Sequence, residues 1–371
     1  MQSPTTRILH IVALQAGFQA RRMADAIKTN IGPGYQIETQ TIGPGGDFTN
    51  LTSSILNIRS KQNKTPQSDP SHQFVHAFGG KALALAVSKN RPIFYTPDDS
   101  PHQSTQRWLR AAGGYRRIET VCHSAVLHRA FIEAGIDVKH CHVIRPGLDF
   151  ARIRRRRDSL LRNALGFAET DRVILLTGES VKASGHRAAL WAAALLNAVD
   201  PKYRVLIWGP GDQTDYLVQF AKRQDRPNML RIAQRELKRE CEFEDLLPAA
   251  DLILSTPLSP TAIMPVSISM AAALPIVATA SYHTGELLED RHTALLSRDN
   301  PRAIAQRILD LERDPNIQWA ISDMARTEAF EYFTMSRFLN QFRTIYLQMA
   351  DGQPIQVPAE RPGVGARFSG K

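Results

Sequence analysis

The chain has 371 residues, 43% of them apolar and 22% charged, which is typical of a folded protein with a sizeable core. Its length suggests two or three domains, and its longest apolar stretch, residues 188–199, is too short to cross a bilayer. The formal net charge of +10 favours acidic partners: nucleic acid, anionic membranes or phosphorylated small molecules.

The first half alternates apolar runs of strand length with stretches of helical spacing. This alternation predicts a parallel, doubly wound α/β sheet, because parallel strands are joined by crossover helices. Strands are expected at residues 8–14, 74–78, 92–96, 119–124 and 142–147, and helices at residues 19–29, 82–87 and 125–134.

The second half repeats the pattern and predicts a second Rossmann-like domain. Strands are expected at residues 172–178, 203–211, 230–233, 251–256 and 275–279, and helices at residues 187–199, 268–273, 303–313 and much of 317–349. The predicted domains are therefore residues 1–150 and 151–350, followed by a flexible tail at residues 351–371. Whether the last helix packs back on the N-terminal domain stays open.

A run of arginines begins at Arg152 and ends at Arg157, at the predicted domain junction. Its simplest interpretation is a solvated basic linker, and the alternative is a peripheral contact with an anionic membrane. Nucleic acid is not expected as a partner, because the chain lacks helix-turn-helix, RRM-type and zinc motifs. The three cysteines form no C-x-x-C pair, so we expect no metal, no cofactor and a cytoplasmic location.

Motifs in the second half resemble a known family. VIRPGLDF, at residues 143–150, is similar to the V-I-P-N-G-V-D signature between the domains of GT-B glycosyltransferases. RNALGF, TGE, LIWGPGD, LLPAADLILST, MAAALPIVAT and TGELLED follow in that family's order and spacing. The chain thus resembles the retaining GT-B glycosyltransferases of family four, the glycosyl transferases group 1. The resemblance is continuous over residues 143–346 and weaker over residues 8–136.

The resemblance implies a GT-B architecture, in which two Rossmann-like domains face a cleft, with the acceptor on the N-terminal domain and a nucleotide-sugar on the C-terminal one. Ligands of doubly wound sheets bind at the carboxyl ends of strands, where glycine turns and helix N-termini direct N–H groups at phosphate. Gly178, Gly209 and Gly211 lie at such predicted ends and are candidate binding residues. The alternative for each is a plain tight turn.

The cations with which this family neutralises the diphosphate are replaced. The usual Gly-Arg and Lys-Gly pairs become Gly-Glu at residues 178–179 and Ser-Gly at residues 184–185. Gly185, Lys182 and Arg187 are the remaining candidates for binding the donor. The two cations reach a diphosphate only if the loop is rearranged, and the alternative is that both face solvent.

Two glutamates that hold the donor in the family are replaced by Pro260 and Ile268. Ser267 and Ser269 flank the second position and are candidates, although a hydroxyl is a weaker acceptor than a carboxylate. Glu286 matches a family glutamate in TGELLED, but tyrosine and histidine replace the two glycines before it. The alternative for Glu286 is a carboxylate favoured by the dipole at a helix N-terminus.

The candidate catalytic residues lie in the first half. Many relatives have His-Asp after the strand that corresponds to PIFYT, whereas this chain has Pro97 and Asp98. His76 in FVHAF matches the family's V-H-A pattern, and its alternative role is packing near the cleft. His76 and Asp98 are therefore the only catalytic candidates that the resemblance provides.

These features predict a glycosyltransferase-like protein that transfers a sugar from a nucleotide-activated donor to an unknown acceptor with non-standard site residues. The alternative is a catalytically inactive GT-B protein that acts as a binding or regulatory partner. This alternative stays open because the residues that make the fold are mostly retained, whereas the polar residues that perform the chemistry are replaced. A dinucleotide enzyme is disfavoured by the lack of a G-x-G-x-x-G motif after a predicted strand.

Overall fold

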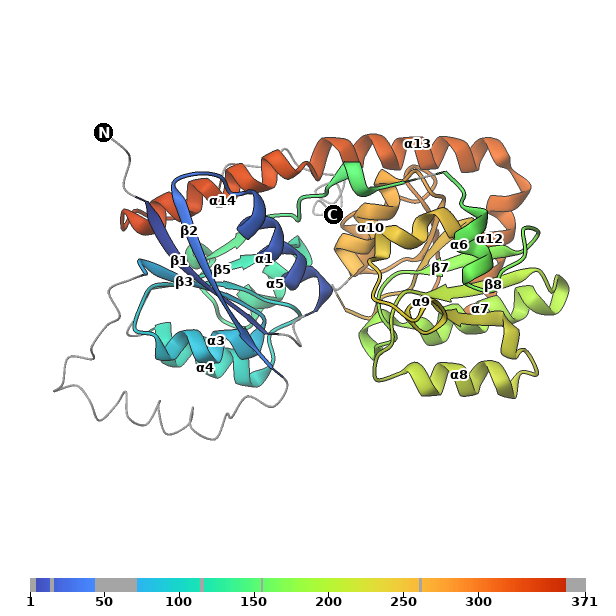
Figure 1. The fold of residues 1–371 in the computed structure, drawn as a ribbon, viewed down its shortest axis with the longest axis horizontal. Helices are drawn as coiled ribbons and strands as arrows, with labels where there is room; N and C mark the ends of the chain where they lie inside the picture. Colours follow the sequence, from blue (N-terminus) through green and yellow to red (C-terminus); the bar gives the residue numbers. More distant parts are fainter. Residues whose placement is uncertain are drawn as a thin grey trace. The chain divides into compact units, whose positions relative to one another are not determined.

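The structure, a computed structural model, describes residues 5–13, 17–43, 72–113, 117–154, 156–259 and 262–357. The chain divides into two compact units (Figure 1). The described residues up to Gly147 and those from Met335 onward form the first unit, and Leu148 to Thr334 form the second. Arg155, Pro260 and the predicted tail beyond residue 357 lie outside the described residues.

Six parallel strands form the sheet of the first unit, in the order β2-β1-β3-β4-β5-β6. They are β1 (Thr6–Ala13), β2 (Tyr35–Ile42), β3 (Phe74–Phe78), β4 (Ile93–Thr96), β5 (Ile118–Cys122) and β6 (Cys141–Val143). The helices are α1 (Phe18–Asn30), α3 (Gly80–Ser88), α4 (Gln103–Gly113), α5 (Ala125–Glu133) and α14 (Met335–Ala350). Helices α3 and α4 pack together on one face of the sheet, and α1 packs against α14 on the other (Figure 1).

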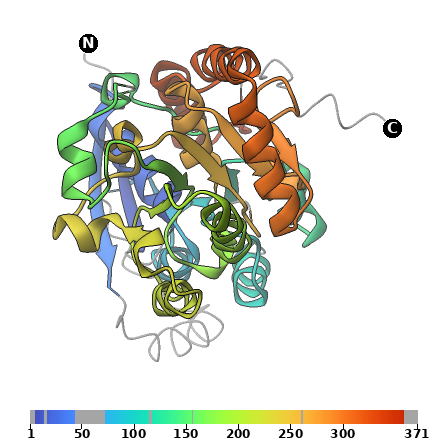
Figure 2. The same ribbon diagram turned by 90° about the vertical axis from the view of Figure 1, so that its right-hand side faces the viewer.

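The second unit has a parallel sheet in the order β12-β11-β10-β7-β8-β9. Its strands are β7 (Arg172–Leu176), β8 (Tyr203–Ile207), β9 (Leu230–Ile232), β10 (Leu252–Ser255), β11 (Ile276–Thr279) and β12 (Leu295–Ser297). Its α-helices are α6 (Ser159–Ala164), α7 (His186–Val199), α8 (Thr214–Arg223), α9 (Ala233–Leu237), α10 (Ile263–Ala271), α11 (Tyr282–Gly285), α12 (Pro301–Arg313) and α13 (Pro315–Tyr332). Helix α7 packs on α8 and α12, and α10 packs on α13. The two views place α8 and α13 on opposite sides of this unit (Figures 1 and 2).

The two parallel sheets confirm the predicted doubly wound α/β class. Several predicted ends are wrong. The strand predicted at residues 203–211 ends at Ile207, and the helix predicted at residues 268–273 begins at Ile263. The helical region predicted over 317–349 is two helices, α13 and α14, and the sequence analysis missed β2, α4, α8 and β12.

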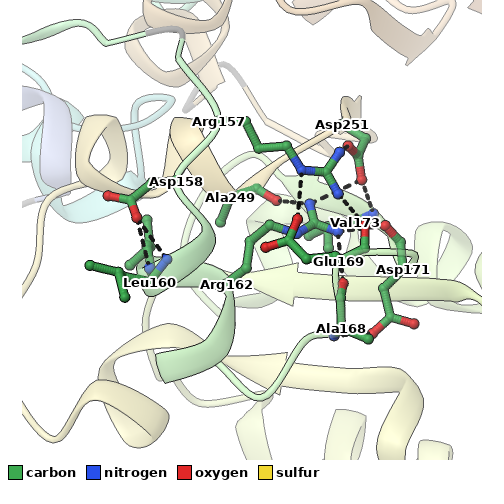
Figure 3. A network of polar contacts seen from close by, with 11 residues as sticks. Arg157, Asp158, Leu160, Arg162, Ala168, Glu169, Asp171, Val173, Ala249 and Asp251 are labelled. Carbon is green, nitrogen blue, oxygen red and sulfur yellow. Dashed lines mark hydrogen bonds and ion pairs between the residues drawn. The ribbon is translucent and has the colours of Figure 1, made fainter.

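The arginines near the start of the second unit hold α6 against the sheet (Figure 3). Arg162 is fully buried and donates hydrogen bonds to the carbonyl oxygens of Ala249 and Asp171, at 2.7 and 2.5 Å. It also pairs with the Asp251 carboxylate at 3.2 Å. The same carboxylate accepts Arg157 Nη1 at 2.9 Å and the Val173 N–H at 2.7 Å. A buried guanidinium is stable only with such partners, so this network is structural.

The arginines of the predicted run therefore differ in their contacts, because some form ion pairs and others face solvent. Arg152 lies 3.8 and 4.0 Å from the carboxylates of Glu244 and Asp245, and Arg157 also pairs with a carboxylate. Arg154 and Arg156 are exposed. The solvated part of the run is thus smaller than its sequence suggests.

Candidate functional site

The sheet of the second unit changes its winding direction between β7 and β10. From β7 the chain continues to β8 and β9 on one side, whereas β10 is followed by β11 and β12 on the other. Ligands of open α/β sheets bind beyond the carboxyl ends of the strands at such a point. The site is therefore built from the loops that follow β7, β8, β10 and β11.

Two glycines in the loop after β7 are required by close approach. Gly178 has a φ of +98°, and a Cβ there would lie 2.7 Å from Ser184 Oγ. Gly185 has a φ of +66°, and a Cβ there would lie 1.8 Å from the carbonyl oxygen of Thr256. Since L side chains rarely adopt these conformations, both positions need glycine for the loop itself. Thr256 Oγ1 also donates to the carbonyl oxygen of Gly185 at 3.1 Å.

The loop after β8 packs on the loop after β7. Ser180 donates to the carbonyl oxygen of Gly209 from its N–H at 3.0 Å and from its hydroxyl at 2.9 Å. A Cβ on Gly211 would lie 2.5 Å from the Ser180 carbonyl oxygen, and one on Gly209 would lie 3.4 Å from Gln234 Oε1. The loops that contain the candidate glycines thus pack closely at the carboxyl ends of β7, β8 and β10, where they form one preformed edge.

The side chains around the start of α7 differ in their exposure to solvent. Lys182, in a short 3₁₀ turn, and Arg187, in the first turn of α7, are both exposed. Between them, His186 is buried with its Nε2 3.3 Å from the Gly178 carbonyl oxygen, and burial lowers its pKa to about 4. Glu179 is half-buried. The buried imidazole at the helix start is therefore neutral, whereas the two cations are exposed.

Helix α10 uses its hydroxyls internally. Ser267 Oγ donates to the Ile263 carbonyl oxygen at 2.7 Å, and Ser269 Oγ donates to the Pro265 carbonyl oxygen at 2.8 Å. Both serines are fully buried, and Ile268 between them is 2% exposed. Serines in helices often bond to the carbonyl four residues earlier, so these hydroxyls need no ligand as partner.

Glu286 corrects one sequence interpretation. It lies at the C-cap of α11 and is 7% exposed, so it is not a carboxylate at a helix N-terminus. The N-terminus of α11 is capped by Ser281, whose hydroxyl accepts the Thr284 N–H at 3.3 Å. Tyr282, at the start of α11, is 84% exposed.

In the first unit, His76 lies inside the core. Its Nδ1 is 2.6 Å from Tyr346 Oη, and its Nε2 is 2.8 Å from Thr96 Oγ1. His10 Nε2 is 3.2 Å from the same tyrosine oxygen. All four side chains are fully buried, and burial lowers the pKa values of both histidines. Both ring nitrogens of His76 thus have partners inside the core, one in α14 and one in β4, and neither is exposed to a ligand.

Asp98 lies at the carboxyl end of the same sheet. It follows β4, and a Cβ on Gly17, at the start of α1, would lie 3.9 Å from the Asp98 Cβ. Burial is the main cause that raises the pKa of its carboxyl, and the Gly80 N–H opposes the shift by a hydrogen bond. Asp98 is therefore at the edge where a ligand of this sheet would bind, whereas His76 is not.

The structure brings the candidates of the second unit to one edge. The loops contain Gly178, Lys182, Gly185, Gly209 and Gly211, whereas Arg187 lies in the first turn of α7 and Glu286 at the C-cap of α11. Sequence analysis did not identify His186 or Ser180 as site residues. The only sequence signal for either of them was the small side chain at position 180. Among the described residues, no group of His, Cys, Asp and Glu could hold a metal, and no helix is long and apolar enough to span a membrane.

A cavity of about 310 Å³ lies at the opposite, amino edge of the second sheet. Its wall includes Arg157, Arg172, Asp251 and Glu312. These charges pair with one another, Arg172 with Glu312 at 2.9 Å and Arg157 with Asp251 at 2.9 Å. The cavity therefore belongs to the structural ion pairs and not to the carboxyl edge.

Residues 158–328 match the family model of the glycosyl transferases group 1. This part of the chain is therefore similar to that family. No curated protein sequence matches the chain significantly. The fold agrees with solved GT-B structures. Anabaena HepE in complex with UDP and glucose has 19% identity and a TM-score of 0.72, over 91% of this chain and 98% of its own.

Two further structures have the same fold. A glycosyltransferase from Rickettsia africae has 17% identity and a TM-score of 0.71, covering 94% of this chain and 99% of its own. A sucrose-phosphate synthase from Thermosynechococcus elongatus has 12% identity and a TM-score of 0.71, covering 94% of this chain and 100% of its own. These comparisons confirm the predicted GT-B architecture.

Proposed function

We propose that the chain transfers a glycosyl group from a nucleotide-activated donor, bound at the carboxyl edge of the second sheet, to an acceptor. The observation that carries the proposal is the family match over residues 158–328, the part of the chain that builds this edge. The solved structure of Anabaena HepE with UDP and glucose supports a nucleotide-sugar as the donor. Retention of the anomeric configuration follows from the resemblance to family four.

The backbone of the edge suits a diphosphate. The glycine-shaped loops are held rigidly, and Gly185 at the N-cap of α7 has no side chain to cover the first N–H groups of the helix. Such N–H groups stabilise phosphate, and cations beside them stabilise the charge that develops as the sugar leaves. Lys182 and Arg187 are the exposed cations nearest in sequence to this helix start.

Asp98 is the proposed acceptor-side group. Its carboxyl is half-buried at the ligand edge of the first sheet, and its raised pKa keeps it a better proton acceptor than an exposed aspartate. A hydroxyl of the acceptor could donate a hydrogen bond to it. His76 has no such role in the proposal, because its ring is enclosed by Tyr346 and Thr96.

The second candidate function is a catalytically inactive GT-B partner protein. It is favoured by one observation: the hydroxyls of Ser267 and Ser269 are bonded inside α10, and Ile268 stands where the family has a donor-binding glutamate. A donor that binds without transfer or hydrolysis would fit this alternative.

Calorimetric titration with UDP-, GDP- and ADP-sugars tests the donor site. Lys182→Ala is expected to weaken binding about 10- to 150-fold, since a charge-assisted contact to phosphate contributes about 1.5–3 kcal/mol. Lys202→Ala is the matched control, because it removes an exposed lysine just before β8, at the amino edge of the same sheet. The donor-site proposal is overturned if no nucleotide-sugar binds the wild-type chain. Binding without donor hydrolysis or transfer selects the inactive alternative.

A contact between an anionic membrane and the exposed Arg154 and Arg156 remains a prediction. Salt-sensitive pelleting of the chain with anionic liposomes tests it, and unchanged pelleting after replacement of both arginines by serine would remove it.

A further inference from the structure

Helix α7 exposes an apolar side, whereas the helices that pack on it expose mostly polar ones. Between Ala188 and Val199 the helix has one hydrophilic side chain, Asn197. That side chain is buried, and its amide donates to two backbone carbonyl oxygens at 2.8 and 3.3 Å. By contrast, the exposed residues of α12 are Arg302, Gln306 and Arg313. The apolar exposed side is therefore particular to α7 among these neighbours.

Three large side chains form a ridge on this helix, which we call the α7 ridge: Trp191, Leu195 and Val199. They are spaced four residues apart and so lie on one side of the helix. Their exposed fractions are 37%, 38% and 83%. The Trp191 ring is held by Phe220 of α8, with ring centroids 4.8 Å apart. Single exposed apolar side chains are common, but a contiguous group of them indicates an interaction surface.

The two ends of α7 carry opposite charges. Arg187 is in the first turn, and Asp200 is the C-cap. The helix dipole favours a carboxylate at the first position and a cation at the second, so neither charge stabilises its own helix. Arg187 is exposed and forms no ion pair within the described residues, and the half-exposed Asp200 accepts the Lys202 N–H at 3.0 Å. A partner with the opposite charge at each end would stabilise both.

We propose that the α7 ridge is an interface between two copies of this chain, with the two α7 helices packed antiparallel across a twofold axis. A twofold axis places each residue opposite the one that is equally far from the helix centre. Arg187 and Asp200 lie at the two ends of the helix, about 20 Å apart along its axis. The arginine of each copy therefore meets the aspartate of the other, which makes the helix complementary to itself.

The same arrangement also matches the apolar side chains in size. Trp191 of one copy packs beside Leu195 of the other, near the axis. Val199, the most exposed member of the ridge, lies opposite Ala188 of the second copy, whose small half-buried side chain leaves room for it. The charged ends set the direction, since parallel helices would bring like charges together. A lipid surface fits less well, because the Asp200 carboxylate would repel anionic headgroups.

The dimer is independent of the proposed transferase activity, and it concerns the outer side of α7. In it, Arg187 pairs with Asp200 of the second copy, which leaves Lys182 as the cation nearest to the donor loops. The mass of the chain in solution, and not donor binding, is therefore the measurement that tests it.

Sedimentation equilibrium of the full chain over a range of concentrations measures the association. The monomer has a mass of 41.4 kDa, and the wild-type chain should reach twice that mass. Leu195→Glu should raise the dimer dissociation constant about 100-fold, because a carboxylate enters the apolar interface from each copy. Met324→Glu is the matched control, since Met324 is also 38% exposed but lies on α13, and it should keep the wild-type mass. Circular dichroism confirms that each variant is folded.

A charge exchange tests the antiparallel pairing separately. Asp200→Arg should weaken the dimer about tenfold, since it places two cations together at both ends of the interface. Combining it with Arg187→Asp reverses both charges, so the double variant should regain the wild-type dissociation constant within about threefold.

Four outcomes overturn the proposal. The first is a wild-type chain that stays monomeric at every concentration. The second is an equal loss of mass in Met324→Glu and Leu195→Glu, which would place any interface elsewhere. The third is a charge-exchanged variant that does not recover. The fourth is a monomer that pellets with phosphatidylcholine vesicles and loses this binding in Leu195→Glu, which would identify a lipid surface as the occupant.

Discussion

The buried histidines of the first unit make its free energy of unfolding depend on pH. The size of this dependence follows from their lowered pKa values. His10 and His76 lie side by side on β1 and β3, and Tyr346 of α14 bridges them. The three contacts can run in either direction along the chain of groups. In one direction His10 Nε2–H donates to Tyr346, Tyr346 donates to His76 Nδ1, and His76 Nε2–H donates to Thr96; in the other, every donor and acceptor is exchanged. In either arrangement both rings are neutral, and the tyrosine hydroxyl both donates and accepts.

The direction of this pH dependence follows from the direction in which the pKa of His10 is shifted. Burial lowers the pKa of His10 from 6.5 to about 3, so below pH 6.5 the unfolded chain binds a proton that the folded chain does not. Stability is therefore full above pH 6.5 and is lost as the pH falls toward 3. At about 1.4 kcal/mol per pH unit, His10 alone removes about 2 kcal/mol between pH 6.5 and 5. His76 acts in the same direction, because burial lowers its pKa too.

Hydrogen–deuterium exchange of peptides from β1, β3 and α14 measures this loss in the first unit alone. The variant His10→Gln cannot be protonated, so its exchange protection should decrease less steeply on acidification, by about 1.4 kcal/mol per pH unit. His102→Gln is the control, since it replaces an exposed histidine in the same unit and should keep the wild-type slope. Equal slopes for wild type and His10→Gln between pH 6.5 and 5 would refute the reasoning.

Three substitutions test the packing described above. Tyr346→Phe should destabilise the first unit by about 2–4 kcal/mol in urea unfolding, because it removes one hydrogen-bond partner from each of two buried histidines. Arg162→Ala should cost about 3–5 kcal/mol by the same measurement, whereas Arg154→Ala should change stability by less than about 0.5 kcal/mol. Gly185→Ala should lower the melting temperature and weaken donor binding, since its Cβ would meet the Thr256 carbonyl oxygen, while Gly285→Ala meets no atom within 4 Å and should be tolerated.

Local sequence patterns predicted the strands that are apolar along their whole length. The run FVHAF is buried at every position of β3, so its pattern needs no knowledge of its neighbours. Strand β2 was missed although the signal is present: its exposed and half-buried residues alternate, as expected for an edge strand with one covered face. Helix α4 was missed because its buried side has few large apolar residues.

The candidate site was harder to predict, because its side chains are defined by distant partners. His76 matches a family pattern, but Tyr346, 270 residues later, encloses it. Gly185 and Thr256 lie 71 residues apart and meet at 3.1 Å between the threonine hydroxyl and the glycine carbonyl. Ser267 and Ser269 look available in sequence, whereas the structure bonds both hydroxyls to their own helix. No local pattern contains these long-range contacts.

The return of α14 to the first unit has a consequence for how the protein is made. His10 is synthesised before its partner Tyr346, which follows 336 residues later. During translation His10 and His76 therefore lack the Tyr346 hydroxyl, and the face of the first sheet that α14 covers stays open, until α14 has been synthesised. The second unit, Leu148 to Thr334, is continuous and can fold before the first is complete. A chain that stops before Met335 would lack the helix that closes the first unit, and such a product should be a substrate for chaperones and proteases.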